Sequence, residues 1–133
     1  MITHLQQPED SKVCGQTVVA MAAGVSIDDV VKLMGHNHGT HTGDLVKAFA
    51  NYGIEAKSKG LIRLNESKGL IWHKLPDFAL LHVRFDRKGE PFHGHWVLWW
   101  DRILHDPGYS IAEVRASDGR ITSYMELIPP VAA

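Results

Sequence analysis

The hydrophobic pattern of this chain changes from helical to strand-like near its middle. In the first half, apolar residues recur at helical spacing in short segments that end at glycine. In the second half, apolar runs with alternating character are typical of strands. Helices first and antiparallel strands later predict an α+β fold, with N-terminal helices packed on a C-terminal antiparallel sheet. A length of 133 residues fits one domain, 1–133.

Three helices are expected in the first half. The first covers 14–23 and is rich in small and apolar residues. The second follows Ser26 as N-cap, has acidic residues in its first turn and ends at Gly35. The third opens at Thr42 and continues to Gly53.

The second half predicts several strands and one clear turn. Strands are expected over 54–57, 78–85, 92–100, 103–105 and 111–115. The polar segment 86–91 predicts a turn. Residues 61–70 fit a helix or a loop, and 123–127 are expected to form a short closing helix or turn.

Charge and hydropathy exclude several classes of partner. Fourteen basic and fifteen acidic residues give a net charge of −1, without the basic excess typical of proteins that bind nucleic acid or anionic membranes. No apolar run approaches the roughly 20 residues that span a bilayer. The N-terminus lacks the pattern of a secretory signal. We therefore expect a cytoplasmic protein, with signal-free export as the alternative.

The chain contains one cysteine, Cys14, which rules out an intramolecular disulfide. Cys14 begins the first predicted helix, where free backbone N–H groups and a partial positive charge favour thiolate over thiol. Gly15 beside it would permit close approach of a substrate backbone. A lone cysteine can also be a small buried hydrophobe. The helix-start position favours a reactive nucleophile.

A base for such a nucleophile is predicted at His95. If Asp101 and Arg102 form a two-residue hairpin turn, Val97 lies opposite Asp106. His95 shares a face with Val97, so Asp106 becomes its diagonal neighbour on the paired strand, with roughly 7–8 Å between the two backbones. A carboxylate at that distance can orient the imidazole.

Alternatives to this pair remain open at the level of sequence. Asp-Arg is not a preferred two-residue turn, and a slip of one residue would place His105 on the face of His95. His93 shares that face and is the second choice for the base. Asp106 also begins an ordinary turn sequence, Asp-Pro-Gly.

Several segments, in this order, resemble the bacteriocin-processing C39 peptidases, a papain-like family. The segments that carry the resemblance are Gln7 before Val13-Cys14-Gly15, Gly39-Thr40 with the helix at 44–49, Tyr52-Gly53-Ile54, Leu75-Pro76 with 78–82, His95-Trp96-Val97-Leu98, and Asp106-Pro107. They extend from residue 6 to about 108. The resemblance implies a papain-like fold and a cysteine hydrolase that cleaves a peptide or amide bond, without a metal or other cofactor.

By this resemblance, Cys14 is the nucleophile, His95 the base and Asp106 the residue that orients the base. Gln7 would join the Cys14 backbone N–H in stabilising the oxyanion, with Gln6 as the reserve. Gln16 is expected to lie along the helix. The partner would be a peptide or protein substrate. C39 domains typically precede an exporter, whereas here we expect a stand-alone domain, so the substrate stays open.

Two other classes of function remain. The histidines of segment 36–41 could suggest a zinc site, but no acid or thiol completes a recognisable ligand spacing, so a polar loop is favoured. A catalytically inactive relative that binds a peptide in the same cleft is the other alternative. The presence of all three catalytic residue types argues against it. Alternation predicts Trp99 on one face of its strand, and Trp96 and Trp100 on the other.

Overall fold

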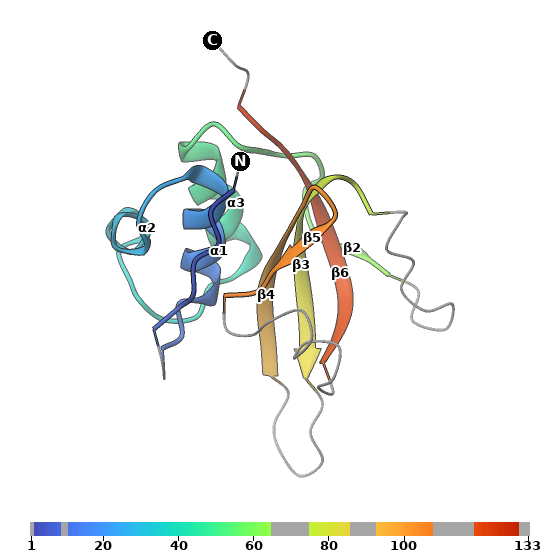
Figure 1. The fold of residues 1–133 in the computed structure, drawn as a ribbon, viewed down its shortest axis with the longest axis horizontal. Coiled ribbons are helices and arrows are strands. Elements are labelled where there is room, and N and C mark those ends of the chain that lie inside the picture. The colour runs from blue at the N-terminus through green and yellow to red at the C-terminus, as the bar shows by residue number, and fades with distance from the viewer. Residues whose placement is uncertain (1, 9–10, 65–74, 86–92, 108–118, 131–133) are drawn as a thin grey trace.

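The computed structural model describes residues 2–8, 11–64, 75–85, 93–107 and 119–130. In these segments three helices precede six strands (Figure 1). The elements are α1 (Cys14–Ala23), α2 (Ile27–Met34), α3 (Thr42–Asn51), β1 (Glu55–Ala56), β2 (Ile62–Arg63), β3 (Phe78–Phe85), β4 (His93–Trp100), β5 (Ile103–His105) and β6 (Gly119–Ile128). The predicted α+β class with an antiparallel sheet is confirmed. The strand expected at 111–115, the turn at 86–91 and most of 61–70 lie outside the described residues.

The helices end where the sequence predicts, because glycine follows α1 and α2 in the left-handed conformation. Gly24 has φ 71° and Gly35 has φ 81°, and each donates its N–H to a carbonyl of the last helical turn. At the start of α2, the Ser26 hydroxyl accepts the Asp29 N–H at 3.1 Å. At the start of α3, the His41 N–H donates to the Asp44 carboxylate at 3.0 Å.

The sheet has the strand order β1-β6-β3-β4-β5, and β2 also pairs with β6. All these pairs are antiparallel. Figure 1 shows α1, α2 and α3 gathered on one side of this sheet. Sequence-adjacent β3, β4 and β5 therefore lie side by side, and the last strand, β6, enters between β1 and β3.

Each face of the sheet carries its own hydrophobic cluster. Leu80, Trp96 and Leu98 belong to the larger cluster, which includes buried residues of all three helices. Leu81, Val97 and Trp99 belong to the smaller cluster on the opposite face. This distribution confirms the predicted alternation of the tryptophans, since Trp100 also packs against the helix-side cluster.

The prediction of a closing helix or turn at 123–127 is wrong, because these residues lie within β6. Alternation in this strand is interrupted by a bulge: His82 pairs with Ser123, whereas the next residue, Val83, pairs with Ile121. The bulge turns Ile121 and Tyr124 toward the same cluster although they are three residues apart. A pattern read from sequence alone loses its period at such a site.

Candidate active site

Helix α1 begins at Cys14 without a side-chain cap. Its N-cap residue, Val13, offers no hydrogen-bonding side chain, and the first turn contains no acidic residue. The first amides of the helix have no intrahelical acceptor and carry the positive end of the helix dipole. Cys14 is partly exposed and is not in a disulfide. The helix start therefore favours a thiolate at Cys14 that a small reagent can reach.

The residue after Cys14, Gly15, is buried against the segment that leads into α3. A Cβ atom added at Gly15 would lie 2.1 Å from the Thr40 Oγ1 and 3.0 Å from a methyl carbon of Leu45. This contact gives Gly15 a packing role, and close approach of a substrate backbone to it remains a prediction. Its missing side chain makes room for Thr40, which packs against the start of α1.

The hairpin that carries the predicted base has the register inferred from the sequence. Trp100 pairs with Ile103, and Leu98 pairs with His105. Asp101 and Arg102 form the turn with φ values of 49° and 66°, as the two central residues of a type I′ turn require.

Contacts outside the hairpin hold this unfavourable turn. The Asp101 N–H donates to the Asp77 carbonyl at 2.9 Å, and the Arg102 guanidinium donates to the Leu75 carbonyl at 3.0 Å. The Arg102 guanidinium also lies 5.4 Å from the ring centroid of Trp99. Tertiary contacts thus compensate a left-handed backbone that costs about 1–2 kcal/mol per non-glycine residue.

This register brings His95 and Asp106 together. The His95 Nε2 lies 2.6 Å from the Asp106 Oδ1, and both side chains are buried. The predicted contact between the imidazole and the carboxylate is confirmed, and the alternative register that would place His105 on the face of His95 is wrong. The side chain of His93, the second choice for the base, lies outside the described residues.

The other side of the imidazole meets the cysteine, because His95 is hydrogen-bonded to the Cys14 thiol as well as to Asp106. Since Nε2 faces Asp106, Nδ1 is the nitrogen left for the thiol. The thiol also accepts hydrogen bonds from the backbone amides of Trp96 and Gly15. One imidazole therefore lies between the sole thiol and a buried carboxylate.

The amide of Trp96 reaches the thiol because β5 is short. In the β4–β5 hairpin, alternate amides of β4 face β5, and the pairing ends at Leu98 and His105. Trp96, two residues before Leu98, is on the same edge but lies past the end of β5. Sequence reasoning missed this donor, although the register that predicted Asp106 also locates it.

Burial and polar contacts shift the pKa values of Cys14 and His95 in opposite directions. Burial alone would raise the pKa of the Cys14 thiol, but the hydrogen bond and charge of His95, with the two backbone amides, lower that pKa overall. Burial would lower the pKa of His95, but the hydrogen bonds to Asp106 and Cys14 and their charges raise it to about 9. Both directions favour a thiolate–imidazolium pair over a neutral thiol beside a neutral imidazole.

A second histidine, His82, lies near the pair and was not singled out from the sequence. Its ring packs edge-on against Trp96, with ring centroids 4.8 Å apart. The pKa of His82 is lowered, first by burial and then by the charge of His95. Burial and the charge of His95 therefore both disfavour the charged form of His82.

Gln7 is held beside the site by its backbone, because the Gln7 N–H donates to the carbonyl of Pro107 at 2.8 Å. Its side-chain Nε2, however, donates to the Ser11 carbonyl at 3.0 Å and lies 3.3 Å from the Ser11 hydroxyl. The predicted oxyanion role of Gln7 remains a prediction. Gln6 is exposed. Gln16 is fully buried and donates to the His36 and His38 carbonyls, which confirms that it lies along α1.

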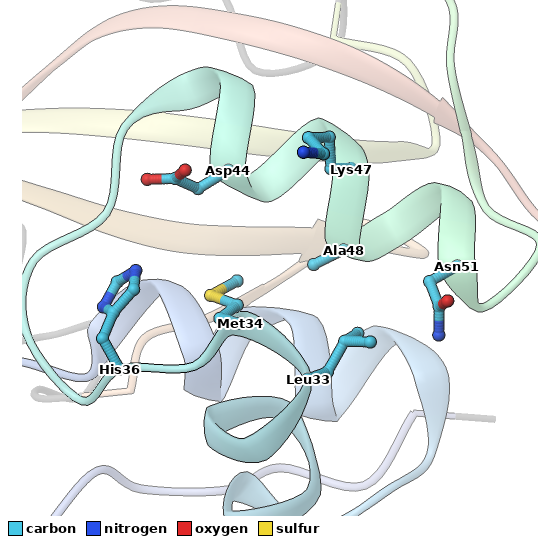
Figure 2. A pocket seen from close by; sticks show the side chains of 7 residues that line it. All are labelled: Leu33, Met34, His36, Asp44, Lys47, Ala48 and Asn51. Carbon is cyan, nitrogen blue, oxygen red and sulfur yellow. The ribbon is translucent and has the colours of Figure 1, made fainter.

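A cavity of about 260 Å³ opens between α2 and α3 (Figure 2). Its lining combines apolar and polar side chains: Leu33, Met34, His36, Asp44, Lys47, Ala48 and Asn51. Neither Cys14, His95 nor Asp106 lines it. In the described part of the chain, no group of three or more His, Cys, Asp or Glu side chains is placed to hold a metal ion. His36 and His38 instead stack on each other, with ring centroids 3.8 Å apart.

Comparisons with protein-family models, with curated proteins and with solved structures gave no match. Within the segments that the structure describes, none of the helices is long and apolar enough to cross a bilayer.

Proposed function

We propose that the protein is a cysteine hydrolase that cleaves a peptide or amide bond with Cys14 as nucleophile, His95 as general base and acid, and Asp106 as the residue that orients His95. The observation that carries this proposal is the position of one buried imidazole between the sole thiol and a buried carboxylate at 2.6 Å. Acyl transfer by a thiol requires a base in contact with the nucleophile and a further group that orients the base. The thiol, imidazole and carboxylate contact one another in this order.

The reaction follows from the ion pair. The Cys14 thiolate forms a C–S bond to the substrate carbonyl carbon, and the carbonyl π electrons move to oxygen. As the tetrahedral intermediate collapses, the C–N bond breaks and the His95 imidazolium gives its proton to the leaving amine. Neutral His95 then removes a proton from water, which attacks the thioester. The second tetrahedral intermediate collapses with cleavage of the C–S bond, the carboxylic acid leaves, and the proton taken from water stays on His95, which restores the thiolate–imidazolium pair.

Asp106 and the start of α1 assist the reaction in two different ways. The Asp106 carboxylate fixes the orientation of the imidazole and stabilises its charged form. The Cys14 N–H, which at the first position of α1 has no intrahelical acceptor, would donate to the developing oxyanion. A nucleophile at a helix start and a base on a neighbouring strand support the papain-like, C39-like type of peptidase, which we include in the proposal.

Alkylation of Cys14 by iodoacetamide across pH tests the proposal. Because Cys14 is the only cysteine, intact mass reports this site alone. We expect reaction well below the ordinary thiol pKa of about 8.5. In His95→Ala the thiolate loses its counter-ion, so the rate at pH 6 should fall on the order of tenfold or more.

His105→Ala is the matched control, because His105 lies one residue from Asp106 and is not among the groups that act on Cys14. Its pH profile should match that of the wild type. If Cys14 reacts like an ordinary thiol in all three proteins, the hydrolase proposal fails and a binding domain becomes the better account.

A further inference from the structure

Two histidines that are far apart in the chain meet at the end of β5. His4, from the segment before α1, and His105, the last residue of β5, are separated by 101 positions in the sequence. Their Nδ1 atoms lie 3.4 Å apart, whereas the centroids of the two rings are 5.5 Å apart. The rings therefore approach each other through their Nδ1 corners. His4 is exposed and His105 is partly buried, so a small ion can reach the pair from solvent.

The distance between the two nitrogens fits a shared metal ion better than a direct hydrogen bond. Hydrogen bonds donated by N–H are usually about 2.7–3.2 Å long, and this distance is longer. Two zinc–nitrogen bonds of about 2.0–2.1 Å that meet at the tetrahedral angle hold their nitrogens roughly 3.3–3.4 Å apart. At the right angle of an octahedral or square-planar ion, the same bonds would hold them roughly 2.8–3.0 Å apart. The observed 3.4 Å therefore matches a tetrahedral ion.

Other contacts hold the two segments that carry these histidines. The Gln7 N–H donates to the Pro107 carbonyl at 2.8 Å, which joins the segment before α1 to the residues that follow β5. His105 itself is paired with β4 in the sheet. Leu5, next to His4, packs against the helix-side cluster. Both imidazoles are thus attached to backbone that is already positioned, so binding an ion costs less conformational entropy.

The protonation of His105 also favours a metal ligand. Burial lowers the pKa of His105, and the charge of His4 lowers it further. The neutral imidazole is the form that binds metal, because a ring nitrogen must offer its lone pair. Imidazole nitrogen suits Zn²⁺, whereas Mg²⁺ and Ca²⁺ prefer oxygen ligands.

We propose that the Nδ1 atoms of His4 and His105 bind one Zn²⁺ ion, with water in its two remaining positions, and that this ion fastens the segment before α1 to the end of β5. Because the two ligands are so far apart in the sequence, the unfolded chain does not present them together, and Zn²⁺ stabilises the native state. This inference does not depend on the proposed hydrolase reaction, since neither Cys14 nor His95 takes part.

Calorimetric titration with Zn²⁺ alone tests the proposal on four proteins that all carry Cys14→Ser, because a thiol beside an imidazole would also bind zinc. The reference protein, with this substitution only, should bind one Zn²⁺ per chain. Adding His4→Ala or His105→Ala removes one of the two ligands. Binding should then weaken roughly tenfold or more, at least as much as when an outer-shell partner of a metal ligand is removed. Co²⁺ in place of Zn²⁺ should give the intense visible bands of a four-coordinate ion.

His38→Ala is the matched control. His38 is also exposed and also lies against another histidine, His36, but its Nδ1 is hydrogen-bonded to the Gly39 carbonyl at 3.2 Å. This variant should keep the reference affinity. Zn²⁺ should raise the melting temperature of the reference protein and of His38→Ala, and much less that of the other two.

Melting curves without Zn²⁺ show whether each variant is folded, so a loss of binding is not confused with unfolding. Equal affinities in all four proteins would overturn the site, since the ion would then bind elsewhere. Failure of the reference protein to bind Zn²⁺, or weak visible bands of a six-coordinate Co²⁺ ion, would overturn it as well.

Discussion

Helices α1 and α2 begin in opposite ways. At the start of α2, Ser26 caps the first turn, and Asp28 and Asp29 supply negative charge to the positive end of the helix dipole. At the start of α1, neither a capping side chain nor an acid is present, and Cys14 occupies the first helical position. One helix start is therefore satisfied by its own sequence. The start of α1 instead carries Cys14. Burial would raise the pKa of Cys14, but contacts with His95 of β4 and with backbone amides lower it overall.

The helix that carries the candidate site therefore begins differently from the other helices that the structure describes. Helix α3 also begins with a carboxylate in its first turn, because Asp44 accepts the His41 N–H. Among these helices, only α1 begins with backbone amides that have no acidic side chain beside them. The side chain at this position, Cys14, is stabilised by residues of the sheet. His95 and the Trp96 amide supply this stabilisation from outside the helix.

The largest expected effect comes from removing the anion at the start of α1. In Cys14→Ser, the hydroxyl does not ionise beside His95, so acyl transfer should fall at least about a thousandfold. Rapid release of p-nitrophenolate from p-nitrophenyl acetate measures this loss without knowledge of the natural substrate. The wild type should release one equivalent per chain in a burst. A burst of equal size in Cys14→Ser would contradict the assignment.

The next effect is on the pH dependence of stability. The raised pKa of His95, about 9 against an ordinary 6.5, gives stability that is complete below pH 6.5 and is lost as pH rises to 9. The lowered pKa of Cys14 gives stability that is complete above the ordinary thiol value of 9.0 and is lost as pH falls through the folded-state pKa. In the overlapping range above neutral pH the two slopes therefore oppose each other in the wild type.

In Cys14→Ser only a histidine slope remains, reduced to the part of the raised His95 pKa that Asp106 supplies. We expect the free energy of unfolding of this variant to fall, relative to the wild type, by up to about 1 kcal/mol per pH unit between pH 7 and 9. Urea unfolding of both proteins at several pH values measures the difference, in which the titrations of all other groups cancel. Parallel curves would mean that thiolate and imidazolium do not form a pair.

A structural feature of this molecule could be predicted from the sequence when it depends on residues that are close together in the chain. The helix ends at Gly24 and Gly35 and the strand pair β4–β5 were predictable, because short-range patterns define them. The hairpin register then located Asp106. The strand β6 was missed, because its bulge breaks the alternation and its partners lie far away in the chain.

The side-chain contacts of Thr40 with Gly15 and of Gln7 with Ser11 were not predicted, for a related reason. No pattern near Gly15 shows that Thr40 packs onto it, and no pattern near Gln7 shows that its amide turns to Ser11. Such contacts depend on how loops fold back, which single-sequence reasoning does not give. The turn at Asp101 and Arg102 is the converse case, since tertiary contacts allow a turn that local preference disfavours.

A smaller effect is expected from crowding the start of α1. In Gly15→Ala the new methyl group would overlap the Thr40 Oγ1, so the free energy of unfolding should fall by about 1–3 kcal/mol. The double variant with Thr40→Gly should recover part of this loss, because the overlapping atom is removed. Denaturant unfolding of the three proteins gives the comparison, and equal losses in single and double variants would show that the contact is not responsible.

The smallest effect is expected at the start of α2. Ser26→Ala removes the hydroxyl that accepts the Asp29 N–H and should lower stability by about 1 kcal/mol. The pH profile of Cys14 alkylation should not change, because α2 contributes none of the groups that act on the thiol. A shift of that profile in Ser26→Ala would show that the two helix starts are not independent.

The central claim is that His95 carries a positive charge opposite a thiolate at neutral pH. Nitrogen-15 NMR of the His95 ring tests it directly, since the shifts of the two ring nitrogens distinguish the imidazolium from either neutral tautomer. The account predicts an imidazolium at pH 7.5 that loses its proton near pH 9, and a lower titration point in Asp106→Asn. A His95 ring that is neutral at pH 7.5 and titrates near 6.5 would contradict it.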